Sequence, residues 1–426
     1  MPSAVSSSTR HVNVVYGLVV LYAFCYQLQA PLEPFLVDSL VGKGSESVAA
    51  YGRLQSFFHV VQTVGSLVFG YLLDRFGLRA GLVVNFLACA LTYLLLANTS
   101  SLTVLYLSKV PGVAMAGFLC AQTAVSQLTP EGSARVAALG RLTTAYTIGG
   151  VLGPYSGGLL GAKGDYFLSA KIAVAGSLLA AALSCALPAR AGRVEHVGRA
   201  EEEKGEAASV LPWRRRAQLV MKYAGFLIVT KLVTSTANSI ASSTQSVVLK
   251  NELGFAEAEL GFFMSCQFAF GGLANGFLLA PLTELLGGST RAVVGKSVAL
   301  MAAGYFFQAG LRSPSLGLLD PFPVVTQTYA FVGVAMLLSV FQYGLSTSIT
   351  AESTQVVPKD MKGTLIGIEH SIFSAARIVT PSVGIHILNS AGASALYVAC
   401  GTIFATVFGT WHALSETFLS HERKSL

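Results

Sequence analysis

Long stretches without a single Asp, Glu, Lys or Arg limit the possible folds of this sequence more than any other feature. A soluble chain carries about a quarter charged residues, whereas only 12% of these 426 residues are charged. A helix needs about 20 apolar residues to cross the hydrocarbon core of a bilayer. The charge-free windows that approach or exceed this length are 11–32, 54–73, 80–108, 110–130, 142–162, 172–189, 232–249, 260–283, 297–311 and 321–351.

Two further apolar segments, 363–389 and 392–415, raise the expected number of transmembrane helices to twelve. The first window is longer than the apolar region of a signal peptide, and no small-residue cleavage site with a soluble domain follows it. We therefore predict an all-α integral membrane protein that crosses the bilayer many times. The charged segment 189–219 divides six spans from six, which predicts an N-terminal bundle over 1–188, a cytoplasmic linker loop over 189–219 and a C-terminal bundle over 220–426.

The two halves contain a repeated segment, which runs over 130–158 in the first half and over 358–384 in the second. At a constant offset of 227, without a gap, Arg135 pairs with Lys362, Gly140 with Gly367, Pro154 with Pro381, and Gly157 with Gly384. Internal repeats of this kind are typical of secondary transporters, which move one bundle against the other around a site near the bilayer midplane. The repeat predicts two pseudo-symmetric six-helix bundles.

Basic residues indicate the orientation in the membrane. With the N-terminus inside, the inner loops and tails carry sixteen Lys and Arg residues, and the outer loops carry four. Positive charge marks the cytoplasmic side, so we expect both termini to be cytoplasmic. The net charge of +7 then reflects topology and contact with anionic lipid, and requires no nucleic acid partner. Neither tail has a recognisable sorting signal, so the plasma membrane and the endomembranes both remain open.

Several motifs resemble those of the major facilitator superfamily. Residues 70–79, GYLLDRFGLR, resemble its loop signature, and the glycines and proline of 149–158 resemble its antiporter motif. The proline pair within 31–34 is similar to that of the drug–proton antiporter branch. Segments 138–142 and 363–367 resemble the organic-cation-transporter-like solute carriers of that branch. Span four departs from the pattern, because Lys109 stands where the family usually has arginine.

The resemblance implies a conformational latch at the cytoplasmic end of span two. There Asp74 would face the helix N-terminus near Gly363, where a carboxylate gains about 0.3–1 kcal/mol from the helix dipole. The expected latch residues are Gly70, Asp74, Arg75, Gly77 and Arg79, with Glu284 as a weaker counterpart in the second half. An ordinary turn with solvated charges is the alternative interpretation.

The glycine motif of span five has a direct physical meaning. It consists of Gly149, Gly153, Pro154, Gly157 and Gly158. The glycines place small residues on one face, where a neighbouring backbone can approach closely. A proline inside a helix frees a carbonyl and introduces a bend. The antiport function of this motif is implied by the family resemblance and does not follow from the glycines themselves.

Polar side chains recur along single faces of several spans. Such faces are costly in lipid and are expected to turn toward each other or toward water. In the family that the chain resembles, spans one, four, seven and ten line a central cavity. The expected substrate and proton pathway comprises Tyr26, Gln29, Glu33, His59, Gln62, Lys231, Asn238, Gln342, Glu369, His370 and Arg377. For any single Ser, Thr or Gln, a hydrogen bond between helices is the alternative.

Arg377 lies near mid-depth of span eleven, where a guanidinium costs at least about 2.5–3.5 kcal/mol unless it has a partner or water. Its candidate partners are Glu33 and an anionic substrate. Burial favours the protonated form of a carboxylate, so Glu369 can act as a proton carrier; the alternative is a structural ion pair with Arg141 or Lys222. No span has a metal-ligand pair at i, i+4 spacing, so we expect no metal and no cofactor.

These features favour a secondary active transporter that moves a small organic solute by alternating access. Proton-coupled antiport of organic cations or drug-like compounds is the form that the resemblance implies. An organic-anion transporter or facilitator that uses Lys231 and Arg377 is the alternative, and a non-transporting membrane sensor that signals through residues 189–219 is a further one. We find no GxSxG, GxGD, His-box or nucleotide-loop pattern, so we expect no enzyme activity. We expect the protein to function as a monomer.

Overall fold

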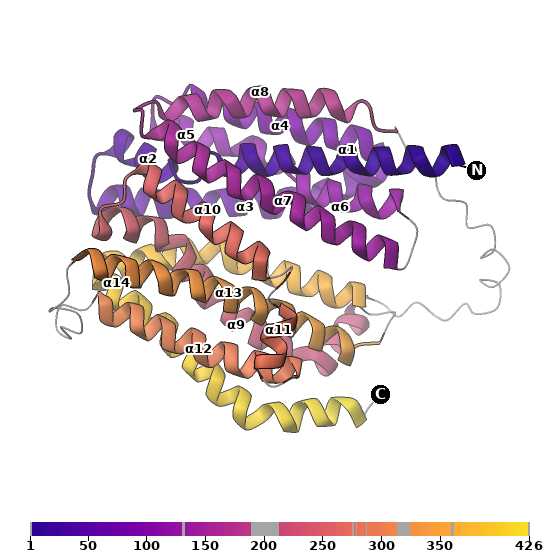
Figure 1. The fold of residues 1–426 in the computed structure, drawn as a ribbon, viewed down its shortest axis with the longest axis vertical. Helices are drawn as coiled ribbons and strands as arrows, with labels where there is room; N and C mark the ends of the chain where they lie inside the picture. Colours follow the sequence, from indigo (N-terminus) through magenta and orange to yellow (C-terminus); the bar gives the residue numbers. More distant parts are fainter. Residues whose placement is uncertain are drawn as a thin grey trace. The chain divides into compact units, whose positions relative to one another are not determined.

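The computed structural model describes residues 2–129, 133–188, 213–274, 277, 279–286, 288–312, 324–358 and 362–424 (Figure 1). Every regular element within these ranges is a helix. The all-α prediction is therefore confirmed for the described part of the chain. The chain divides into two compact units, Met1–Ala208 with Gly254–Ala269, and Ser209–Leu253 with Phe270–Leu426.

Seven helices of the described residues are long and apolar enough to cross a membrane. They lie within Leu78–Ala97, Leu102–Leu128, Tyr166–Ser184, Arg214–Leu253, Thr290–Leu311, Thr326–Val356 and Ser371–Leu414. These segments establish several crossings, while the number of twelve stays a prediction of the sequence.

The first unit contains the regular elements up to residue 184 and most of one later helix. Its elements are α1 (Pro2–Gln27), α2 (Glu33–Val41), α3 (Ser45–Phe76), α4 (Leu78–Ala97), α5 (Leu102–Lys109), the 3₁₀ helix η1 (Val110–Ala114), α6 (Gly117–Leu128), α7 (Ser133–Gly161), α8 (Tyr166–Ser184) and most of α10 (Glu257–Leu273). Helix α1 lies against α6, α7 and α8, and α4 lies against α8.

The first helix ends earlier than the charge-free window 11–32 indicates. Helix α1 stops at Gln27, and Glu33 begins the separate helix α2 after a series of turns. Pro31 has no N–H group to donate to the carbonyl of Gln27, which instead accepts a bond from Ala30 N at 3.1 Å. The polar stripe expected along span one is therefore interrupted before Glu33.

Three other boundaries differ from those expected. Helix α4 ends at Ala97, inside the window 80–108, and α5 begins after Ser101, whose hydroxyl accepts a bond from Val104 N at 3.4 Å. Helix α8 begins near 166 instead of 172, because the charge on Lys171 truncated the window. Its first turn is capped by Asp165, which accepts bonds from Phe167 N and Leu168 N at 2.9 and 3.0 Å.

The second unit contains α9 (Trp213–Leu253), α11 (Leu279–Leu285), α12 (Thr290–Leu311), α13 (Val324–Val356) and α14 (Lys362–Lys424). Helix α14 contacts α9 and α12, and its path changes at Gly392, where φ is 80°. Residues 213–219 are helical although we expected them in the linker, because WRRRAQL consists mostly of good helix formers. The rest of that segment, 189–212, lies outside the described residues.

The sequence repeat has a counterpart in local packing. A Cβ atom added to Gly157 of α7 would overlap the carbonyl oxygen of Leu28, just after α1, and one added to Gly384 of α14 would lie 3.0 Å from the carbonyl oxygen of Ile240 in α9. The same position of the repeat thus allows close approach in both halves. Gly157 lets α7 approach the end of α1, and Gly384 lets α14 approach α9.

Candidate functional site

A carboxylate and an ammonium group form an ion pair inside the first unit. Glu33, in the first turn of α2, pairs with Lys109 at the end of α5. The amide of Gln55, from α3, donates to the second carboxylate oxygen at 2.5 Å. Both charged side chains are only 12% exposed. We call Glu33 and Lys109 the first ion pair.

Aromatic rings surround the first ion pair. The ammonium of Lys109 lies 5.3 Å from the ring centroid of Phe58, which itself lies 6.3 Å from the ring of Tyr26. Tyr26 stacks in turn on Tyr22 at 6.1 Å. A desolvated cation close to an aromatic ring is stabilised by about 2 kcal/mol. The predicted pathway residue Tyr26 is thus connected to the ion pair through Phe58.

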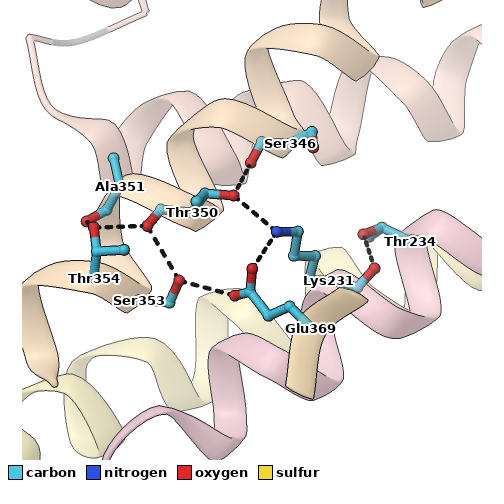
Figure 2. A network of polar contacts seen from close by, with 8 residues as sticks. All are labelled: Lys231, Thr234, Ser346, Thr350, Ala351, Ser353, Thr354 and Glu369. Atoms are coloured by element: carbon cyan, nitrogen blue, oxygen red, sulfur yellow. Dashed lines mark hydrogen bonds and ion pairs between the residues drawn. The ribbon is translucent and has the colours of Figure 1, made fainter. Parts of the chain in front are cut away.

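A second ion pair lies inside the second unit (Figure 2). The ammonium of Lys231, from α9, is 2.5 Å from Oε2 of Glu369, from α14. It also donates to the hydroxyl of Thr350 at 2.8 Å, and the hydroxyl of Ser353 donates to Oε1 of Glu369 at 3.0 Å. The Lys231 side chain is 21% exposed and that of Glu369 only 5%. Three helices, α9, α13 and α14, thus meet at one charge-neutral cluster.

The α13 hydroxyls are oriented by their own helix. Thr350 Oγ1 donates to the carbonyl of Ser346 at 2.9 Å, so its lone pairs are free to accept from Lys231. Ser353 can also donate to the carbonyl of Thr350 at 3.1 Å. Because residues three apart share a helix face, Thr350 and Ser353 point to the same ion pair, as Figure 2 shows.

A third buried acid, in the second unit, precedes Ser353 in the sequence. Glu352 of α13 is 4% exposed; it accepts a hydrogen bond from the hydroxyl of Thr290 and lies 3.5 Å from Nε of Arg291, both at the start of α12. Glu352 and Ser353 are adjacent, so α13 turns one polar side chain to α12 and the next to α14. Glu352 was not among the predicted site residues, because only the packing of α12 on α13 reveals its partners.

Two expected ion-pair partners are replaced by others. Glu33 was a candidate partner of Arg377, and the structure pairs it with Lys109 instead. The alternative partners expected for Glu369, Arg141 and Lys222, give way to Lys231. The sequence could not distinguish these pairs, because the pairing residues lie 76 and 138 positions apart and meet only through helix packing.

The remaining pathway residues occupy varied places. Ser169 donates to Gln29 at 2.9 Å, and Tyr305 donates to Asn238 at 3.1 Å. His59 and Gln62 are half-buried, and the backbone carbonyl of His59 accepts from Thr63 at 2.8 Å. The Oε1 atom of Gln342 is buried without a hydrogen-bond partner among the described residues.

Arg377 and His370 are the last two residues of the predicted pathway. Arg377 is exposed, and its guanidinium lies 5.6 Å from the ring centroid of Phe373. The side chain of His370 lies outside the described residues. A hydrogen bond between helices, which was the alternative role for a single polar residue, accounts for expected positions such as Asn238.

The latch is described only in part. The surroundings of Gly70, Asp74 and Arg75 lie outside what the structure describes, as do those of Gly363. Gly77 precedes α4 with φ of 83°, a conformation that favours glycine, and Nε of Arg79 donates to the carbonyl of Leu187 at 2.5 Å. Glu284 of α11 is exposed. The latch itself stays a prediction.

The glycine motif of α7 contacts two helices of the first unit. Cβ atoms added to Gly149, Gly153 and Gly157, spaced four residues apart, would meet the backbone of α1 and of the turn that follows it. On an adjacent face, one added to Gly158 would lie 2.5 Å from the carbonyl oxygen of Glu257, and one added to Gly261 of α10 would overlap the carbonyl oxygen of Pro154. The motif therefore permits close packing on α1 and α10 together.

Several residues of these clusters were not among the site residues predicted from the sequence. These are Gln55, Lys109, Thr350, Glu352 and Ser353. For Lys109 a signal was present, because an uncompensated lysine within an apolar span requires a partner. For the serine and threonine no such signal exists, since these residues also form ordinary hydrogen bonds within helices.

Apolar helices that enclose one neutralised ion pair in each unit are typical of a membrane transporter. The sequence profile of the Major Facilitator Superfamily matches residues 15–311. The chain belongs to this superfamily and is a multi-pass membrane transporter.

Relatives agree with this assignment. Human solute carrier family 67 member A1 is 30% identical over 87% of this chain and 84% of its own length. Mouse solute carrier family 22 member 18 is 27% identical over 87% of each chain. The class C tetracycline resistance protein of Escherichia coli is 26% identical over 71% of this chain and 74% of its own.

Solved structures show the same fold. A peptide transporter POT in complex with sulfate aligns with a TM-score of 0.70 and 15% identity, over 96% of this chain and 95% of its own. The human organic anion transporter MFSD10 (TETRAN) aligns with a TM-score of 0.61 and 17% identity, over 95% of this chain and 99% of its own.

Proposed function

We propose that the protein is a proton-coupled secondary active transporter of small organic solutes that works by alternating access. The observation that supports this proposal is the pair of buried lysine–carboxylate contacts, Glu33 with Lys109 and Lys231 with Glu369. A buried ion pair contributes little net stability compared with apolar residues of similar volume. Two such pairs in apolar helices are therefore better explained by a function than by folding.

Protonation gives each pair two states. When a proton binds Glu369, the attraction to Lys231 is lost and the cluster gains one positive charge. Removing that proton restores the contact between α9 and α14. Because an equilibrium between two conformations shifts only through a difference in binding between them, a proton that breaks a contact between helices can favour one conformation over the other.

Antiport of an organic cation or drug-like compound is the form expected from the drug–proton antiporter branch. The similarity to a tetracycline resistance protein supports this form. In such an exchange the cation and the proton compete for the same carboxylate, Glu33 or Glu369. The close packing of α7 on α1 at Gly149, Gly153 and Gly157 accords with the antiporter motif.

Transport of an organic anion is a second candidate, which the charge distribution favours. Both acids of the two ion pairs already contact a lysine, and Arg377 in the second unit is exposed beside an aromatic ring. A cation would have to displace a lysine, whereas an anion needs only a lysine released by protonation. A solved relative of this fold is an organic anion transporter.

The proposed membrane location, orientation and oligomeric state are those predicted from the sequence. We propose a protein embedded in a lipid bilayer as a monomer, with both termini in the cytoplasm. The plasma membrane and the endomembranes are both compatible with the proposal.

Proton movement in proteoliposomes tests this function. A pH-sensitive dye in the lumen reports protons that move when a panel of organic cations and anions is added outside. We expect at least one compound to drive proton movement through the wild-type protein, and expect Glu33→Gln and Glu369→Gln to reduce it severely. Solute exchange whose rate is independent of the pH gradient and is unchanged in both variants would contradict the proposal.

A further inference from the structure

We propose that Lys231, held in place by Thr350, forms a binding site for a carboxylate group of the transported solute, which replaces the carboxylate of Glu369 once Glu369 is protonated. This inference rests on the proposed proton coupling and on the organic-anion candidate.

The two side chains of the second ion pair differ in how much of each is exposed. The Lys231 side chain is 21% exposed while that of Glu369 is 5% exposed, so part of the lysine side chain is open where its carboxylate partner does not cover it. The first ion pair lacks this difference, because Glu33 and Lys109 are equally buried at 12%. The second ion pair is therefore better suited to exchange one carboxylate for another.

The ammonium of Lys231 has hydrogen-bonding capacity for a further oxygen. A lysine ammonium has three donors, and the described contacts of Lys231 use two of them, to Glu369 and to Thr350. One donor remains for an oxygen of the solute before Glu369 is released. The Ser353 hydroxyl can turn to donate its hydrogen bond to the carbonyl of Thr350, 3.1 Å away, and then accept a bond from protonated Glu369. Protonated Glu369 thus keeps a partner after Lys231 leaves it.

The neighbouring charged groups either have partners of their own or are exposed, so Lys231 is the group that can change partner. Glu352 of α13 is turned to Thr290 and Arg291 of α12. On the other elements packed against α14, Lys222 of α9 and Lys296 of α12 are exposed. On α14 itself, Arg377 is exposed and lies eight residues from Glu369, about 12 Å along the helix axis.

The charge balance makes proton and anion binding mutually supportive. One proton goes to the carboxylate of Glu369, and one carboxylate goes to the ammonium of Lys231. The loaded site then has the same net charge as the empty one. A monocarboxylate should accordingly bind together with one proton and be carried in the same direction.

Thermal unfolding of the purified full-length protein tests the site, with propionate and benzoate as probes and their amides as uncharged controls at equal ionic strength. For the wild type, the half-effective carboxylate concentration should be at least about tenfold lower at acidic than at neutral pH, because only protonated Glu369 leaves the site open. Glu369→Gln should bind the probes equally at both pH values. Lys231→Gln should lose the response, and Lys222→Gln, which removes an exposed lysine from the same helix, should match the wild type.

The outcomes separate this inference from the proposed function. Benzoate binding that is equal in Lys231→Gln and in the wild type would overturn the site, as would a response to the amides alone or no response to either acid. Proton-coupled flux of a cation that survives in Lys231→Gln would overturn it while leaving proton coupling intact. The same melting curves without added probe report whether each variant folds.

Discussion

Replacing Lys231 with methionine is expected to lower the free energy of unfolding by about 3–5 kcal/mol, because it leaves Glu369 as an unpaired charge among three packed helices. Adding Glu369→Gln to Lys231→Met should recover most of this loss, since the uncompensated charge is then removed. The two single variants and the double variant form a double-mutant cycle, which thermal or denaturant unfolding can measure.

The matched control for this cycle is Lys222→Met, which removes an exposed lysine from the same helix. We expect it to change stability by less than about 0.5 kcal/mol. Strictly additive effects of Lys231→Met and Glu369→Gln would show that the two side chains do not stabilise one another.

Replacing Gly157 with alanine is expected to destabilise the protein by about 1–3 kcal/mol or more, because the added methyl group would overlap the carbonyl oxygen of Leu28. That atom belongs to the backbone and cannot move aside as a flexible side chain can. The contact between α7 and the end of α1 would therefore have to open. Transport should fall together with stability, since Leu28 lies in the series of turns that connects α1 to Glu33.

Gly140 provides the matched control on the same helix. A methyl group there meets nothing within 4 Å, so Gly140→Ala should leave the protein as stable as the wild type or more stable by about 0.5–1 kcal/mol. If Gly157→Ala and Gly140→Ala behaved alike in unfolding experiments, the close approach of α7 to α1 would not contribute to stability.

Most of the fold could be predicted from the sequence, because the dominant physical constraint acts on composition. A chain with charge-free windows near the length of a bilayer crossing has few alternatives to transmembrane helices. Windows locate helix ends poorly, however. The end of α1 depends on one missing N–H at Pro31, and the start of α8 was hidden by Lys171 inside the helix.

The candidate site could be predicted only as a set of residues. Glu33, Lys231 and Glu369 were identifiable because charged groups are costly in apolar spans. Their partners were not, since Lys231 and Glu369 are 138 positions apart and are joined by the packing of α9 on α14. Thr350 and Ser353 resemble any other hydroxyl residues in the sequence. Only the ion pair beside them gives these two side chains a distinct role.

The central claim is that carboxylates paired with buried lysines take up the coupling proton. Infrared difference spectroscopy between neutral and acidic pH detects newly protonated carboxyl groups directly. We expect the wild-type protein to gain a carboxyl band that is reduced in Glu369→Gln, reduced in Glu33→Gln, and smallest in the double variant. A band of equal size in all four proteins would mean that neither carboxylate binds a proton, and would contradict the account.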